Sequence, residues 1–212
     1  MAGTGLFLCV FLIGHLAGNL QLIFVGGQEG QLQFNEYAKF MTTNPLVKIL
    51  SYLTYFSIIA HAIDGLILTI KNKKARPVNY VYNKPEKNSK WASRNMGILG
   101  TILLVFIVTH MMNFWYVMHF GPIGVDAAGN RDLHTVVFAF FQKGEMSMVF
   151  VALYVVSMIA TAFHLSHGFN SAFQSFGWNH PKYSPIIKKA GAAFAILVPA
   201  LFAIIPLIIH FS

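Results

Sequence analysis

The chain has 212 residues, of which 56% are hydrophobic and 10% are charged, with a mean hydropathy of +0.59. Soluble domains carry about 25% charged residues, so this composition excludes an ordinary soluble enzyme. The net charge of +8 is compatible with nucleic acid, but 15% aromatic residues and long uncharged runs indicate lipid instead. We therefore expect a lipid environment and no nucleic-acid partner. The single cysteine, Cys9, excludes an internal disulfide and an all-cysteine metal site within the chain.

Five stretches with almost no charge are long enough to cross a bilayer, which takes about 20 apolar residues. They predict an all-α membrane protein, a single domain over residues 1–212 with five transmembrane helices. The expected spans are about 3–27, 45–71, 96–120, 146–176 and 186–211. The last span has two prolines and no histidine at mid-depth, so we expect it to lie at the periphery of a bundle formed by the first four.

The first span lacks the basic segment and the cleavage pattern of a signal peptide. It opens at Met1 without flanking charge, which predicts a short basic stretch upstream in the natural chain. Eleven of the fifteen Lys and Arg residues lie between residues 71 and 94 or between 182 and 189. Because positive loops stay in the cytoplasm, the N-terminus is predicted inside and the C-terminus outside.

Four of the nine histidines lie well within different spans: His15, His61, His110 and His164. An ionisable side chain at that depth is a functional-site hypothesis, although a lone histidine more often makes an interhelical hydrogen bond. Four helices contributing one histidine each favour two b-type haems, each held by two axial imidazoles from facing helices. Zinc or copper is less favoured, because no cysteine, methionine or carboxylate cluster accompanies these histidines.

Depth suggests how the four histidines pair. With a rise of about 1.5 Å per residue, His61 lies roughly 15 Å and His164 roughly 20 Å from the inner boundary. His110 lies roughly 24 Å from the same boundary, which leaves His15 as its partner. The sequence therefore predicts an inner pair and an outer pair.

Three further residues are candidates for the same site. His167 shares a helix face with His164 and is a second candidate ligand or a contact for a haem propionate. Asp64 follows His61 by three residues. Two roles for it are equally favoured: handling protons or binding a quinone, and compensating the charge of nearby lysines. Arg94 is a candidate propionate contact or a topology signal. Of the other histidines, His119 and His210 are expected at helix ends, and His134 and His180 in loops.

The chain resembles the single-chain, dihaem cytochrome b membrane anchors of succinate dehydrogenases and fumarate reductases. The resemblance covers essentially the whole chain and rests on short motifs in a fixed order. They are Thr4-Gly5-Leu6-Phe7 leading to His15-Leu16-Ala17-Gly18-Asn19, His61-Ala62-Ile63-Asp64-Gly65 leading to Lys74-Ala75-Arg76-Pro77, Ala92-Ser93-Arg94-Asn95-Met96 followed by His110, and His164-Leu165-Ser166-His167-Gly168.

This resemblance implies that His15, His61, His110 and His164 are the axial ligands of two b haems. It implies that His61 pairs with His164 in the haem nearer an iron–sulfur subunit, and that His15 pairs with His110 in the distal one. The family has a glycine four residues after its fourth ligand, which favours His164 over His167. It also implies a flavoprotein subunit, an iron–sulfur subunit, a membrane quinone that is most often menaquinone, and a multi-pass location in the bacterial cytoplasmic membrane.

The main hypothesis is therefore a membrane-anchor and electron-transfer subunit of succinate:quinone oxidoreductase. The cytochrome b subunit of a hydrogenase or a formate dehydrogenase is an alternative that would share the haem ligation. A proton-coupled transporter with a histidine relay is a third hypothesis, from a different class. The five spans show no inverted repeat, which argues against the transporter.

Overall fold

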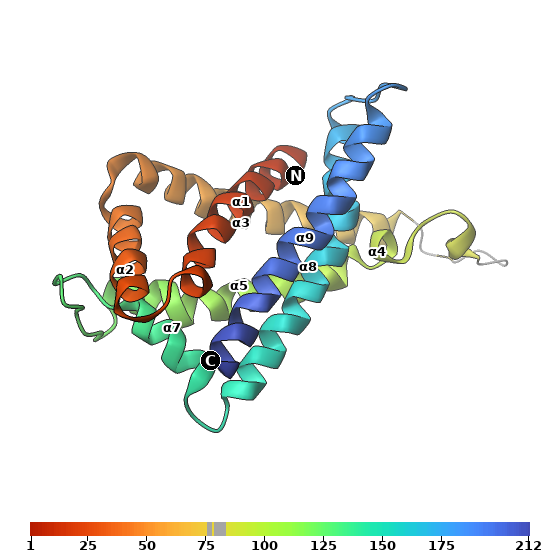
Figure 1. Cartoon of the computed structure of the whole chain (residues 1–212). Coiled ribbons are helices and arrows are strands. Elements are labelled where there is room, and N and C mark those ends of the chain that lie inside the picture. Colours follow the sequence, from red (N-terminus) through yellow and green to blue (C-terminus); the bar gives the residue numbers. More distant parts are fainter. Residues whose placement is uncertain (76–77, 79–83) are drawn as a thin grey trace.

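The computed structural model describes residues 1–75, 78 and 84–212 (Figure 1). Five of its helical stretches are long and apolar enough to cross a membrane: Ala2–Phe24, Pro45–Lys74, Met96–Phe120, Ser147–Ser175 and Ser184–Phe211. Every end lies within three residues of the predicted span. The structure therefore supports a multi-pass membrane protein, as the hydropathy predicted.

The first two spans are α1 (Ala2–Phe24) and α3 (Pro45–Lys74). The α1 helix ends at Val25, and Gly27 makes the turn that follows with a φ of 65°, a conformation that favours glycine. The α3 helix begins where the side chain of Asn44 accepts hydrogen bonds from two backbone N–H groups of its first turn, with Pro45 at the first helical position.

The third span consists of α5 (Met96–His110), a π-helical segment (Met111–Tyr116) and α6 (Val117–Phe120). Within the π segment, Trp115 Nε1 donates a hydrogen bond of 2.7 Å to the hydroxyl of Tyr55 on α3. A short helix, α4 (Trp91–Arg94), and a 3₁₀ turn (Pro85–Lys87) precede this span. The fourth and fifth spans are α8 (Ser147–Ser175) and α9 (Ser184–Phe211).

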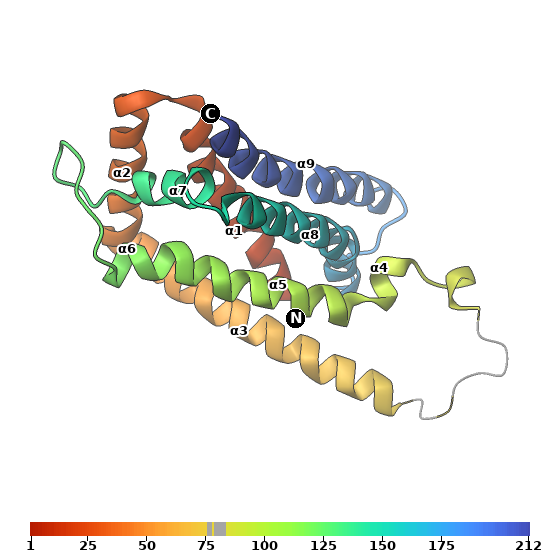
Figure 2. The same cartoon turned by 90° about the horizontal axis from the view of Figure 1, so that it is seen from below.

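The four histidine-bearing helices form a four-sided bundle. The α1 helix packs against α3 and α8, and α5 packs against the same two helices. Figure 2 shows α5 between α3 and α8, with α1 passing behind them. Consequently α1 and α5 occupy one diagonal of the bundle, and α3 and α8 occupy the other.

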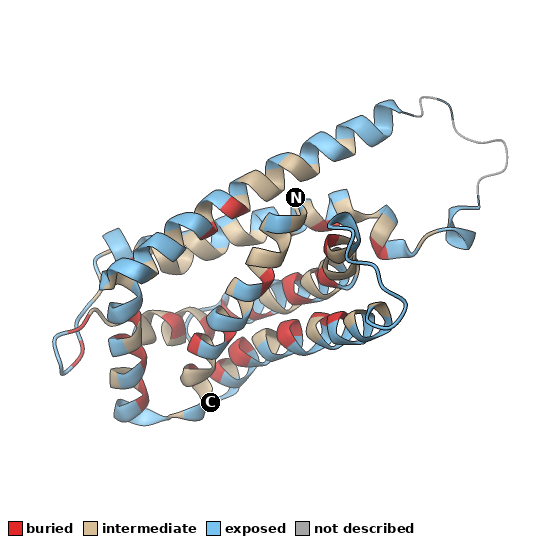
Figure 3. Ribbon diagram, turned by 90° about the horizontal axis from the view of Figure 1, so that it is seen from above, coloured by how far each residue is buried: buried red, intermediate tan, exposed pale blue. Residues whose placement is uncertain are grey.

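The fifth span lies outside the four-sided bundle but packs closely against one side of it. The α9 helix packs along α8 and also contacts α1 and α7 (Leu133–Gln142). Ile209 is fully buried and Ala195 nearly so, whereas Figure 3 colours α3 as mostly exposed or intermediate. A Cβ at Gly191 would lie 2.6 Å from Cδ1 of Phe169, so this glycine permits the close approach of α9 to α8.

Two helices of ten or more residues lie outside the spans in the described part of the chain and were not predicted. They are α2 (Gly27–Thr43) and α7, which both lie at the end of the molecule expected to face outward. The α2 helix occupies the connection between the first two predicted spans, and His134 was expected in a loop but lies in the first turn of α7. Both helices bury only one face, with Phe34 and Ala38 on α2 and Val137 and Phe141 on α7.

Candidate functional site

The outer histidine pair joins the first diagonal of the bundle. The rings of His15 on α1 and His110 on α5 lie 5.8 Å apart, centre to centre, and nearly perpendicular at 86°. Aromatic rings surround the pair, and both histidines are partly buried among them. Their centres lie between 5.2 and 6.0 Å from one histidine or the other: Phe11, Phe106, Phe114, Tyr154 and Phe202.

The inner histidine pair joins the second diagonal. The rings of His61 on α3 and His164 on α8 lie 6.1 Å apart with an angle of 62° between their planes. Thr4 of α1 contacts His61, and a Cβ at Gly100 of α5 would lie 4.0 Å from Cε1 of His164. All four bundle helices therefore meet at this pair.

The helical rise along α1 and the rise along α5 give about the same axial distance between the two histidine pairs. Along α1, Thr4 lies level with the inner pair, and His15 follows it at about 16 Å for a helical rise of 1.5 Å per residue. Along α5, Gly100 lies beside His164, and His110 follows it at about 15 Å. The pairs are thus stacked along the bundle, one toward each membrane face.

The geometry of both pairs fits a shared metal ion. Two imidazoles that each place a nitrogen about 2 Å from one metal have ring centres about 6 Å apart. Two imidazoles alone are too few ligands for a bare ion, but they complete the coordination of an iron held by a macrocycle. No heavy atom lies within 4 Å of the position that a Cβ would occupy at Gly168, one turn along α8 from His164. At 5.8 and 6.1 Å between ring centres, both pairs therefore fit the spacing of two imidazoles that hold one haem iron.

The Nδ1 atoms of the four histidines have different partners. His61 Nδ1 lies 3.2 Å from Thr4 Oγ1, and His110 Nδ1 lies 3.4 Å from Tyr154 Oη. His15 Nδ1 lies 3.4 Å from the side-chain nitrogen of Asn19, which also donates to the His15 carbonyl oxygen at 2.8 Å. His164 Nδ1 is buried and has no hydrogen-bond partner among the residues that the structure describes. His61 therefore has the shortest of these side-chain contacts.

The remaining candidates make contacts of their own, and Asp64 is linked to the inner pair through Met1 and Thr4. His167 Nε2 lies 3.1 Å from the hydroxyl of Ser171 on its own helix. Arg94 is exposed, and its guanidinium donates to the backbone oxygen of Ser89. Asp64 forms an ion pair of 2.7 Å with the amino group of Met1. Arg76 and Pro77, which belong to one of the quoted motifs, lie outside the described residues.

A polar cap closes the outer end of the bundle. Asn35 of α2 is fully buried, and its Nδ2 donates to Asp126 at 3.2 Å and to Asp132 at 2.9 Å. Its Oδ1 accepts a hydrogen bond of 2.9 Å from the backbone N–H of His134. This one side chain thereby joins α2 to the loop at 121–132 and to the start of α7.

A pocket of about 520 Å³ lies beside this cap, between α1, α7 and α9. Its lining is apolar on the side toward the bundle, where Leu22 and Ile209 contribute, and polar toward the cap, where Gln31 and His134 contribute. Leu22 follows His15 by two turns of α1, so the pocket lies about 10 Å outward of the outer pair.

Sequence reasoning missed the aromatic residues around the outer pair, the contact of Thr4 and the cap. A signal existed for some of them, since Phe11 precedes His15 by one helical turn and Phe106 precedes His110 by one turn.

Comparison with protein-family models, with characterised proteins and with solved structures finds no significant match to this chain.

Proposed function

We propose that this chain is the membrane-anchor and electron-transfer subunit of a succinate:quinone oxidoreductase. The observation that carries the proposal is the pair of diagonal histidine contacts, 5.8 and 6.1 Å between ring centres, at two depths of one bundle. The Nδ1 atoms of His61 and His110 lie 3.2 and 3.4 Å from hydroxyl groups on neighbouring helices, but such an interhelical contact engages only one nitrogen of each ring. Here an imidazole faces an imidazole at both levels, which is the arrangement required for axial ligation.

In this proposal His15 and His110 hold one b haem and His61 and His164 hold the other. Iron with two axial imidazoles supplies one-electron transfer. The chain's own residues orient the ligands from four helices, and aromatic side chains pack around the outer pair. The first four spans then serve as the haem-binding bundle, with Phe202 of α9 completing the wall beside His15.

The proposed orientation places the N-terminus in the cytoplasm of a bacterium, with the chain in its cytoplasmic membrane. The basic segments at 71–94 and 182–189 then form the inner surface. A flavoprotein and an iron–sulfur subunit dock on that surface, nearer to the His61 and His164 pair. Haems held by the two pairs would supply a route for electrons between the inner and the outer pair, in the reverse direction when fumarate is reduced.

The quinone, menaquinone in this proposal, is assigned to the outer pocket between α1, α7 and α9. Its apolar side suits an isoprenoid tail, and the polar residues near the cap suit a quinone oxygen. His134→Ala is expected to slow quinone reduction without changing succinate oxidation by a soluble acceptor. Unchanged quinone reduction in this variant would place the quinone elsewhere.

Purification of the tagged chain from its native membrane in mild detergent tests the proposal. We expect a red preparation that contains a flavoprotein and an iron–sulfur subunit and that reduces a soluble menaquinone analogue with succinate. Hydrogenase or formate dehydrogenase subunits in their place would support the alternative cytochrome. A colourless preparation with proton-coupled transport activity would contradict both.

A further inference from the structure

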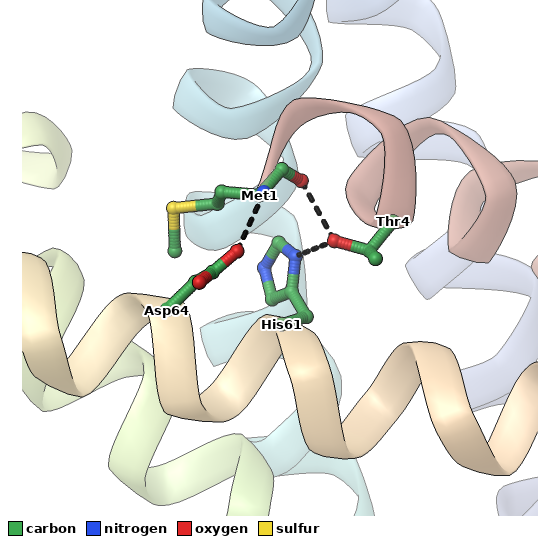
Figure 4. Close-up of polar contacts among 4 residues, drawn as sticks. All are labelled: Met1, Thr4, His61 and Asp64. Atoms are coloured by element: carbon green, nitrogen blue, oxygen red, sulfur yellow. Dashed lines mark hydrogen bonds and ion pairs between the residues drawn. The ribbon is translucent and has the colours of Figure 1, made fainter.

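The hydroxyl of Thr4 lies between two polar atoms (Figure 4). Its oxygen is 2.9 Å from the carbonyl oxygen of Met1, three residues earlier on α1, and 3.2 Å from Nδ1 of His61 on α3. A hydroxyl has one proton to donate and lone pairs that accept. The carbonyl oxygen can only accept, so the hydroxyl proton is directed to Met1. The remaining contact then requires His61 to donate from Nδ1.

The position of that proton decides which nitrogen of His61 is free. A neutral imidazole carries one N–H, so a proton on Nδ1 leaves the lone pair of Nε2 available for a metal. Only this tautomer satisfies both contacts of the Thr4 hydroxyl. The second imidazole of the inner pair differs, because Nδ1 of His164 is buried without a partner in the described part of the chain.

We propose that Thr4 is a positioning residue that holds His61 in the tautomer required for axial ligation. This inference rests on the proposed function and deepens it. Hydrogen bonds from the second ring nitrogen orient a ligating histidine and raise its basicity. A more basic axial ligand stabilises ferric over ferrous iron. The hydroxyl of Thr4 therefore lowers the midpoint potential of the inner haem and leaves that of the outer haem unchanged.

The test is a redox titration of the intact complex, followed by the optical spectra of the two haems. Thr4→Val removes the hydroxyl and keeps the shape of the side chain, whereas Thr4→Ser keeps the hydroxyl. Thr101→Val is the matched control, because the Thr101 hydroxyl donates to a backbone carbonyl of its own helix at 2.9 Å without contacting a histidine. Haem content is measured on every preparation.

We expect Thr4→Val to shift the potential of the inner haem upward, with Thr4→Ser and Thr101→Val close to wild type. Loss of the inner haem in Thr4→Val alone would support the same role, since the serine variant shows that the hydroxyl is what matters. An unchanged potential in Thr4→Val, an equal shift of both haems, or failure of Thr4→Ser to restore the value would overturn the inference. If the wild-type complex contains no haem, the proposed function fails as well.

Discussion

The rings of His15 and His110 lie edge to face across one diagonal of the bundle, 5.8 Å apart. The α1 and α5 helices that carry them pack mainly against the two helices on the other diagonal. A contact across a diagonal fixes the relative rotation of both helices. Replacing either residue therefore removes the imidazole contact between these two helices.

The fourth span carries two candidate haem ligands, and substitutions can distinguish them. We expect His164→Ala to lose the inner haem or convert it to high spin, because His164 is the residue that faces His61. His167→Ala is expected to retain both haems, since His167 contacts Ser171 of its own helix. The haem content and the optical spectrum of each purified variant measure this. Loss of a haem in His167→Ala, with retention in His164→Ala, would reverse the assignment.

The orientation in the membrane is testable with single cysteines in a Cys9→Ser background. An impermeant maleimide added to right-side-out spheroplasts is expected to label Ala127→Cys in the outer loop. Asn88→Cys, in the basic segment, is expected to react only after the membrane is permeabilised. Both residues are exposed, so accessibility of the side chain does not limit either reaction. The opposite labelling pattern would invert the topology.

The cap at Asn35 makes a prediction for stability. Asn35→Ala removes two hydrogen bonds to carboxylates and one from a backbone N–H. We expect the free energy of unfolding in mixed micelles to fall by about 2–4 kcal/mol. Gln33→Ala, on the exposed side of the same helix, is the control and is expected to change it by less than about 0.5 kcal/mol. Equal effects of the two substitutions would show that the cap is not a stabilising contact.

The same cap predicts a dependence on pH. Burial raises the pKa of the Asp126 and Asp132 carboxyl groups, but hydrogen bonds from Asn35 and from neighbouring groups outweigh it and hold both pKa values below the ordinary 3.8. A lowered pKa in the folded state gives stability that is complete above the unfolded value and is lost as the pH falls through the folded one.

The destabilisation caused by Asn35→Ala is therefore expected to be constant between about pH 5 and pH 8 and to shrink toward pH 3. Unfolding of the wild type and the variant at several pH values measures the difference. A difference that stays the same down to pH 3 would contradict the assignment of charged carboxylates to the cap.

The five spans were predictable because the thickness of the bilayer sets their length and the gaps between charged residues mark their ends. The α2 and α7 helices were not, because a helix with one buried face is neither long nor uniformly apolar. In α7 the buried residues Val137 and Phe141 are four residues apart, as on one face of a helix. So short a pattern identifies a helix only when the element that packs against it is known.

The identity of the four histidines and their approximate depth followed from the sequence, and the structure places the expected partners together. The close packing of α9 against α8 did not follow from the sequence, because the two prolines within α9 do not prevent it. The contact of Thr4 with His61 also did not follow, since it depends on the rotation of two helices about their axes. Whether the pairs bind haem stays a prediction.

The most direct test of the account is the haem content of the purified complex, with the wild type compared to His15→Ala and His61→Ala. We predict two low-spin b haems per chain in the wild type. Each variant is predicted to retain one low-spin haem, with a different one affected in each. No haem in the wild type, or two intact low-spin haems in either variant, would contradict the assignment of the histidine pairs as axial ligands.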